Sequence, residues 1–143
     1  MIIRTPNNPQ EWEDYFSLRY NVLRKPLNQP LGSERNDGDS TGKHFALYDN
    51  TILTAIGRLD IVDSEKVQAR FVAVLEVEHG KGYGKQIMHA MEEYGRLNGY
   101  HKMILHARDY ALNFYEKLGY QKIEKSYKLF DVLQHYLMTK NLN

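Results

Sequence analysis

The feature that most constrains this chain is a glycine-rich junction at residues 77–87, "VEHGKGYGKQI", where a strand-like run meets a helix-like run. Gly80, Gly82 and Gly84 leave the backbone without side chains where the helix should begin. Glycine permits positive φ angles and close approach of a ligand to the main chain. The N–H groups and the dipole at a helix start favour a bound anion. The junction therefore predicts either a phosphate cradle or a flexible connection.

Two common phosphate-binding motifs do not fit this junction. A Walker A loop needs a glycine, four residues and then Gly-Lys-Ser/Thr. If Gly84 and Lys85 supply the Gly-Lys pair, His79 stands at the first glycine and Gln86 at the hydroxyl position. The dinucleotide fingerprint G-x-G-x-x-G fails because Lys85 occupies its last glycine position. What remains is a strand, then G-x-G-x-G, then a helix.

Sequence patterns along the rest of the chain predict both strands and helices. The expected strands are residues 1–5, a hairpin over 44–63 that turns at Asp49-Asn50, residues 66–77, residues 101–107 and two closing strands within 121–142. The expected helices are residues 9–22, 84–98 and 108–118. This order of elements predicts an α/β (or α+β) domain with a mixed sheet.

The sequence also predicts where two helices begin or end and which residues of the second helix form an apolar stripe. Asn8 is the expected N-cap of the first helix, Pro9 suits its first position, and Gly99 should stop the second helix. One apolar stripe of the second helix is expected to contain Ile87, Ala90, Met91, Tyr94 and Leu97.

Length and composition limit the possible classes of protein. The 143 residues fit one domain, 1–143, with 42% hydrophobic residues. The absence of cysteine excludes disulfides, zinc–thiolate sites and cysteine nucleophiles. A net charge of +1 argues against a dedicated nucleic-acid binder. No secretion signal and no membrane-spanning run are recognisable, so a cytoplasmic location without membrane attachment is expected.

Two motifs resemble one enzyme family. Val74 and the following "HGKGYG" resemble motif A of the GNAT superfamily of acyl-CoA-dependent N-acetyltransferases, V-x-x-x-x-[Q/R]-G-x-G-x-[G/A]. The later "ARDYALNFYEKLGY" resembles that family's second signature, carried here by Ala111, Phe114, Tyr115, Gly119 and Tyr120. The resemblance implies a strongly twisted mixed β-sheet flanked by helices and splayed between the fourth and fifth strands, at 66–77 and 101–107.

The resemblance also implies acetyl-CoA as co-substrate, with its thioester attacked directly by a primary amine. The N–H groups of residues 79–84 would hold the pyrophosphate, and the pantetheine arm would extend the sheet along the fourth strand. A bulge in that strand would let the Val74 N–H polarise the thioester oxygen. The implied cofactor-binding residues are Val72, Val74, His79, Gly80, Lys81, Gly82, Tyr83, Gly84, Lys85, Arg108 and Asn113.

Two positions depart from the family pattern. His79 replaces the usual glutamine or arginine, so its ring would contact the pyrophosphate or the residue would contribute only its N–H. Arg108 stands where many members carry asparagine. It would either face the cofactor phosphates or extend into solvent.

The catalytic residues follow from chemistry combined with the resemblance. Tyr115 is the expected general acid for the departing thiolate, because phenol and thiol pKa values differ by only about 1.5 units. The alternative is that Tyr115 packs in the core beside Phe114. For the general base, Glu34 or Asp37 in the loop, His106 at the end of its strand, and water alone all remain open. No metal-ligand spacing is present.

The sequence says least about the acceptor substrate. The long loop over residues 23–43 is a candidate substrate wall. Its four basic residues against three acidic ones favour neither a cationic nor an anionic acceptor. A small-molecule or peptide amine is expected, with the chain acting as a monomer or homodimer. The rival hypotheses are a catalytically silent acyl-CoA sensor and a structural partner protein.

Overall fold

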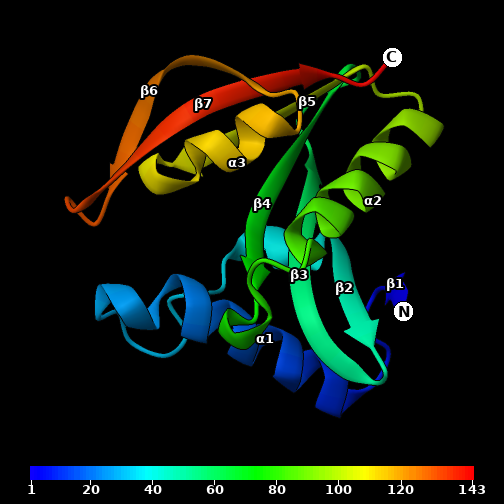
Figure 1. Ribbon diagram of the computed structural model, residues 1–143, viewed down its shortest axis with the longest axis vertical. Helices are drawn as coiled ribbons and strands as arrows, with labels where there is room; N and C mark the ends of the chain where they lie inside the picture. Colours follow the sequence, from blue (N-terminus) through cyan, green and yellow to red (C-terminus); the bar gives the residue numbers. More distant parts are fainter. The chain divides into compact units, whose positions relative to one another are not determined.

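The computed structural model describes all residues from Met1 to Asn143. Seven strands form one sheet in the order β1-β2-β3-β4-β5-β7-β6 (Figure 1). The strands are β1 (Ile2–Arg4), β2 (Lys43–Asp49), β3 (Ile52–Ile61), β4 (Lys66–Val74), β5 (Lys102–Arg108), β6 (Gln121–Leu129) and β7 (Leu133–Asn141). The helices are α1 (Pro9–Leu23), α2 (Tyr83–Leu97) and α3 (Leu112–Lys117), with short 3₁₀ turns η1 (Lys25–Leu27), η2 (Asp37–Ser40), η3 (Glu76–Glu78) and η4 (Asp109–Ala111). The predicted mixed sheet with flanking helices is confirmed.

The chain forms two compact units, and the first comprises residues 1–60 and 69–91. In it β1, β2 and β3 pair antiparallel. Helix α1 begins as predicted, because the Asn8 side chain accepts the Glu11 N–H at 2.9 Å. The hairpin turn is one residue later than predicted: Asn50 and Thr51 carry the positive φ angles, 51° and 71°. Two successive positive φ angles are what a two-residue turn between twisted strands requires.

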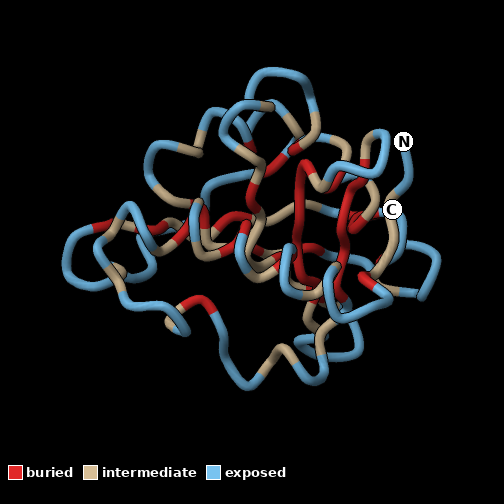
Figure 2. Tube along the Cα trace, turned by 90° about the horizontal axis from the view of Figure 1, so that it is seen from below, coloured by how far each residue is buried: buried red, intermediate tan, exposed pale blue.

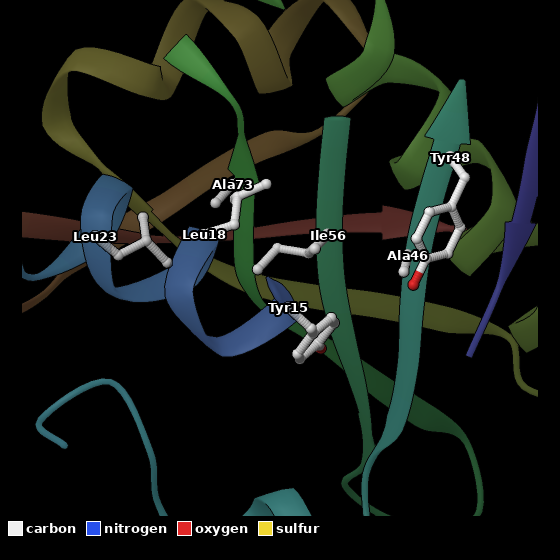
Figure 3. Packing of buried hydrophobic residues seen from close by; sticks show 7 residues of the cluster. All are labelled: Tyr15, Leu18, Leu23, Ala46, Tyr48, Ile56 and Ala73. Carbon is white, nitrogen blue, oxygen red and sulfur yellow. The ribbon is translucent and has the colours of Figure 1, made fainter. Parts of the chain in front are cut away.

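The core of the first unit lies between α1 and the strands. Most of the buried residues lie within strands and on helix faces, while most of the connecting loops are exposed (Figure 2). Side chains from α1 lie against side chains from β2, β3 and β4 in this cluster (Figure 3), which consists of Tyr15, Leu18, Leu23, Ala46, Tyr48, Ile56 and Ala73. This packing fixes β4, the strand that leads into the glycine junction.

The second unit comprises residues 61–68 and 92–143. Strand β7 pairs antiparallel with both β5 and β6. The start of β4, Lys66–Gln68, pairs parallel with Lys102–Ile104 of β5, and this ladder has only those three residue pairs. So short a ladder is what the predicted splay between the fourth and fifth strands requires. None of the helices is both long and apolar enough to cross a membrane.

The predicted stripe of helix α2 is partly wrong. Ile87 and Met91 are fully buried, but Tyr94 is 37% and Leu97 76% exposed. The buried face runs instead through Met88, Glu92 and Gly95. A pattern of apolar residues does not identify this face, because one member is a carboxylate and another has no side chain.

Glu92 is buried because the second unit gives both its oxygens a partner. Its Oε2 accepts the Tyr120 hydroxyl at 2.7 Å, and its Oε1 accepts Lys140 Nζ at 2.9 Å. A buried carboxylate is tolerated only when it is hydrogen-bonded and paired in this way. The three side chains therefore connect α2 to β7 and to the end of α3.

Glu92→Gln is expected to lower the free energy of unfolding by about 1.5 kcal/mol, because the amide keeps the shape but loses the charge that pairs with Lys140. Urea denaturation measures this change. Glu93→Gln is the matched control, since Glu93 is exposed and pairs only with Arg96 along the helix; it should change stability by less than about 0.5 kcal/mol. Equal losses in the two variants would contradict a stabilising role for the Glu92 cluster.

Candidate active site

The glycine junction has the backbone geometry of an anion cradle. Gly80 and Gly82 have φ angles of 84° and 82°, a region that residues with a Cβ rarely adopt. A Cβ at either position would meet no atom within 4 Å. The glycines are therefore required by the path of the backbone and not by packing, and the space in front of them is open.

Helix α2 presents its N-terminus at this opening. The Gly82 carbonyl accepts the Gln86 N–H at 3.1 Å, which makes Gly82 the N-cap. The N–H groups at the first positions of a helix have no partner within the helix, and here they belong to Tyr83, Gly84 and Lys85. Their partial positive charge is suited to a phosphate oxygen.

His79 has a role that the sequence did not reveal. Its Nε2 lies 2.9 Å from the Val74 carbonyl oxygen. Because a carbonyl only accepts, Nε2 donates, and the ring links the junction back to the end of β4. The His79 backbone N–H donates to Glu76 O at 3.2 Å, so it is already engaged within the chain.

Two side chains of the junction are anchored by carboxylates. Lys81 Nζ lies 2.7 Å from Glu78 Oε2. The Tyr83 hydroxyl donates to Asp49 Oδ2 at 2.5 Å, and this hydrogen bond raises the pKa of Tyr83 to about 12. Tyr83 thus ties the first turn of α2 to the β2–β3 hairpin and stays protonated at neutral pH.

Strand β4 has the irregularity expected of a cofactor-binding strand. Phe71 has a φ angle of 54°, which breaks the alternation of side chains in the middle of the strand. After the strand ends, the Leu75 N–H donates to Thr54 O at 2.8 Å. Val72 and Val74 are half-buried along the same stretch. Breaks of this kind are common beside active sites, where they re-aim neighbouring groups.

The other predicted residues belong to the second unit. Tyr115 of α3 is 9% exposed, with its ring edge-on to Phe114 at 4.9 Å between centroids. Burial raises the pKa of Tyr115, and the charge of Arg108 acts in the opposite direction. Arg108 Nη1 donates to the Tyr110 hydroxyl at 3.0 Å. Asn113 is exposed on the same short helix.

Two of the three candidate base residues, Glu34 and His106, have different surroundings. Glu34 is only 2% exposed; its Oε1 accepts the Gly32 N–H at 2.8 Å and its Oε2 lies 3.2 Å from Arg35 Nε. Glu34 therefore orders the loop that it belongs to. His106 is half-buried on β5, with its ring 5.4 Å from that of Tyr127.

A buried polar network in the first unit was not anticipated. His44 Nε2 donates to Asp39 O at 2.8 Å, and its Nδ1 lies 2.8 Å from the Tyr15 hydroxyl. Burial lowers the pKa of His44 and raises that of Tyr15 to about 12. Arg19 Nη2 donates to the same hydroxyl. The only signal in the sequence was that Arg19 follows Tyr15 by one helical turn.

Comparison with known proteins agrees with the site's geometry. The model of the "Acetyltransferase (GNAT) family" matches residues 7–120. The chain belongs to this family. The family and the acyltransferase activity predicted from the two motifs are thereby confirmed.

Relatives and solved structures extend the similarity over nearly the whole chain. The uncharacterized N-acetyltransferase YjcF of Bacillus subtilis is 28% identical over 134 residues, which cover 94% of this chain and 95% of YjcF. An aminoglycoside 6'-N-acetyltransferase complexed with coenzyme A has a TM-score of 0.83 at 15% identity, covering 100% of this chain and 98% of that one. A GNAT family acetyltransferase from Elizabethkingia anophelis with acetyl-CoA bound has a TM-score of 0.76 at 14% identity, covering 98% and 95%. These structures share the fold of this chain.

Proposed function

We propose that this GNAT acetyltransferase transfers an acetyl group from acetyl-CoA to the primary amine of a small molecule or peptide. The observation that carries the proposal is the junction itself: Gly80 and Gly82 at positive φ, with open space before the N-terminus of α2. Family membership supports it, as do the coenzyme A and acetyl-CoA bound by the two solved structures of the same fold. The family match includes residues of both units, so the proposed functional domain is the whole of residues 1–143.

In this proposal the pyrophosphate rests on the N–H groups from Gly80 to Lys85. The His79 N–H is not part of this cradle, because it donates to Glu76 O. The His79 ring instead holds the end of β4 and so fixes the position of the Val74 main chain. The Val74 N–H polarises the thioester oxygen, and Val72 lies along the pantetheine arm. Lys81 and Tyr83 of the first unit and Arg108 and Asn113 of the second are the remaining proposed cofactor-binding side chains.

The chemical step is direct attack by a neutral amine. A C–N bond forms at the thioester carbon, the C–S bond breaks, and Tyr115 gives its proton to the departing sulfur. The amine loses its extra proton to a base. Between Glu34 and His106 we favour His106, because both oxygens of the buried Glu34 are already engaged. Histidine is also the side chain whose intrinsic pKa lies in the range where a base must work.

Calorimetric titration with acetyl-CoA, followed by an amine panel that measures released CoA thiol, tests the proposal. We expect saturable binding and turnover of at least one class of primary amine. Binding without turnover of any amine would identify a silent acyl-CoA sensor. Absence of binding by the folded protein would leave only the structural-partner hypothesis.

A further inference from the structure

Five arginines of the first unit surround two phenylalanine rings, and we call this group the arginine–aromatic cluster. The Cζ atoms nearest the Phe71 centroid belong to Arg19 (4.2 Å), Arg58 (5.0 Å), Arg70 (5.2 Å) and Arg24 (5.6 Å). Arg35 Cζ lies 4.0 Å from the Phe16 centroid, and Arg19 Cζ lies 5.0 Å from it. Guanidinium groups stack favourably on aromatic faces, so the two rings hold the arginines together despite their like charge.

Three carboxylates neutralise the cluster only in part. Asp39 Oδ1 pairs with Arg19 at 2.9 Å and with Arg58 at 2.8 Å. Burial acts to raise the pKa of Asp39, but the hydrogen bonds from these arginines outweigh burial and lower this pKa below its usual value. The carboxyl therefore stays ionised. Both carboxylate oxygens of Asp60 accept hydrogen bonds from Arg58, and Glu34 forms an ion pair with Arg35. Five cations against three anions leave a formal charge of +2.

Arg70 is a member of the cluster that keeps hydrogen-bond donors available to a ligand. Its side chain is 38% exposed, and its ion pair with Asp60 is long, at 4.0 Å. Both oxygens of Asp60 are already taken by Arg58 at 2.8 Å. The planar guanidinium of Arg70 therefore keeps donors for a bidentate anion, the geometry that arginine forms with carboxylate and phosphate.

Two arginines form the fixed, buried part of the cluster. Arg19 and Arg58 are 0% exposed, so water does not screen their charges. Arg19 Nε has no hydrogen-bond partner at all. Because Asp39 and Asp60 pair with these two arginines, the surplus positive charge of the cluster is carried by Arg24, Arg35 and Arg70.

The cluster lies on the strand proposed to hold the thioester. Arg70 directly precedes Phe71, whose positive φ breaks the alternation and brings both side chains to the cluster. Val74 is four residues further along, or about 13 Å of strand. The loop expected as a substrate wall contributes Arg24 and Arg35 to the cluster, together with the paired carboxylate of Asp39. The other arginines, Arg19 and Arg58, come from α1 and β3.

We propose that the acceptor is an amine that also carries an anionic group, a carboxylate or a phosphate, several bonds from the reacting nitrogen, and that Arg70 binds this group. Short peptides with a free carboxylate have this chemistry. So do amines that bear a phosphate. This inference rests on the proposed function, because it names the acceptor of the same site.

Matched pairs of acceptors test the proposal. Triglycine is compared with triglycinamide, and O-phosphoethanolamine with ethanolamine, by the ratio of their kcat/KM values for CoA thiol release. We expect the anionic member of at least one pair to be favoured by about 10- to 100-fold, the effect of a charge-assisted bidentate contact. The pair that shows the larger ratio identifies carboxylate or phosphate as the natural group.

The Arg70→Gln variant should reduce that ratio to about one. Arg70→Lys should keep an intermediate ratio, because lysine retains the charge but cannot form the bidentate contact of a guanidinium. Arg96→Gln is the matched control: Arg96 is 42% exposed and pairs with Glu93 in the second unit, and the ratio should not change. Equal rates for both members of each pair, or an unchanged ratio in Arg70→Gln, would overturn the proposal.

A binding measurement separates failure of this inference from failure of the proposed function. Triglycine, triglycinamide and inorganic phosphate are titrated calorimetrically into the protein at low ionic strength. If acetyl-CoA is neither bound nor turned over, the proposed function fails. The anion site would still be established if the protein binds triglycine but not triglycinamide, and if the Arg70→Gln variant no longer binds triglycine. No binding of triglycine or phosphate together with no anionic preference would refute the anion site while leaving the acetyltransferase proposal intact.

Discussion

Gly82→Glu is expected to abolish measurable binding of acetyl-CoA. Gly82 is the N-cap of α2, and the added side chain would enter the open space before the helix N–H groups. A carboxylate about 4 Å from a phosphate charge costs roughly 4 kcal/mol at an effective dielectric constant of 20, so affinity should fall by about 10³-fold or more. Isothermal titration calorimetry with acetyl-CoA measures the loss.

A matched variant separates this charge effect from backbone strain. Gly99 follows α2, has a φ angle of 87°, and would also meet no atom within 4 Å if it carried a Cβ. Gly99→Glu therefore imposes a similar strain, of about 1–3 kcal/mol, at a place with no proposed ligand. It should lower the melting temperature as Gly82→Glu does while keeping affinity for acetyl-CoA. Retained affinity in Gly82→Glu would place the cofactor cradle elsewhere.

The parts of the fold that the sequence predicted well depend on short-range chemistry. Asn8 caps α1 through a residue three positions away, and Gly99 and Gly119 have the positive φ angles expected where helices stop. The glycine junction belongs to the same class, because its conformation is set within a few residues. The order of elements followed from these local signals, and the order was enough to indicate the fold.

The parts that the sequence did not predict depend on partners far along the chain. Glu92 is buried only because Tyr120 and Lys140 reach it, 28 and 48 residues later. Arg58 is buried only because Asn36, Asp39 and Asp60 surround it. Charge summed along one loop therefore does not describe its surroundings: the loop is nearly balanced, but Arg58 and Arg70 from the neighbouring strands lie beside its charged residues.

His79 shows a third limit of prediction from sequence. A motif fixes where a residue stands but not the direction of its side chain. The family motif indicates a contact from position 79 to pyrophosphate, whereas the His79 ring turns back to the Val74 carbonyl. A five-residue separation allows either direction, and only the tertiary path of the junction decides between them.

Tyr115→Phe is expected to lower kcat by about 10²-fold or more while leaving acetyl-CoA affinity unchanged. The substitution removes a single hydroxyl, and general acid catalysis contributes roughly 10²- to 10⁴-fold. The ring keeps its edge-on contacts with Phe114 and Tyr120, so packing around α3 should persist. Steady-state release of CoA thiol gives kcat, and calorimetry gives the affinity.

Tyr120→Phe controls for a general effect of losing a buried hydroxyl. The Tyr120 hydroxyl donates to Glu92, so its loss should reduce stability without changing the chemical step. If Tyr120→Phe lowers kcat as much as Tyr115→Phe does, the effect of the latter is structural. An unchanged kcat in Tyr115→Phe at every pH would remove Tyr115 from the proposed role.

The raised pKa of Tyr115 predicts how this role depends on pH. A general acid must be protonated, and burial keeps this phenol protonated above the pH of about 10 at which an ordinary tyrosine ionises. The alkaline decline of kcat in the wild type should therefore begin above pH 10 and be absent from the residual activity of Tyr115→Phe.

The burial of Tyr115 also makes its phenol a weaker acid toward a thiolate whose thiol has a pKa near 8.5, which widens the pKa difference that proton transfer must overcome. Arg108 counteracts this effect, because its charge favours the phenolate. Arg108→Gln should consequently lower kcat in the wild-type background and change it little in the Tyr115→Phe background. Additive losses of kcat in the double variant would show that Arg108 does not act through the phenol.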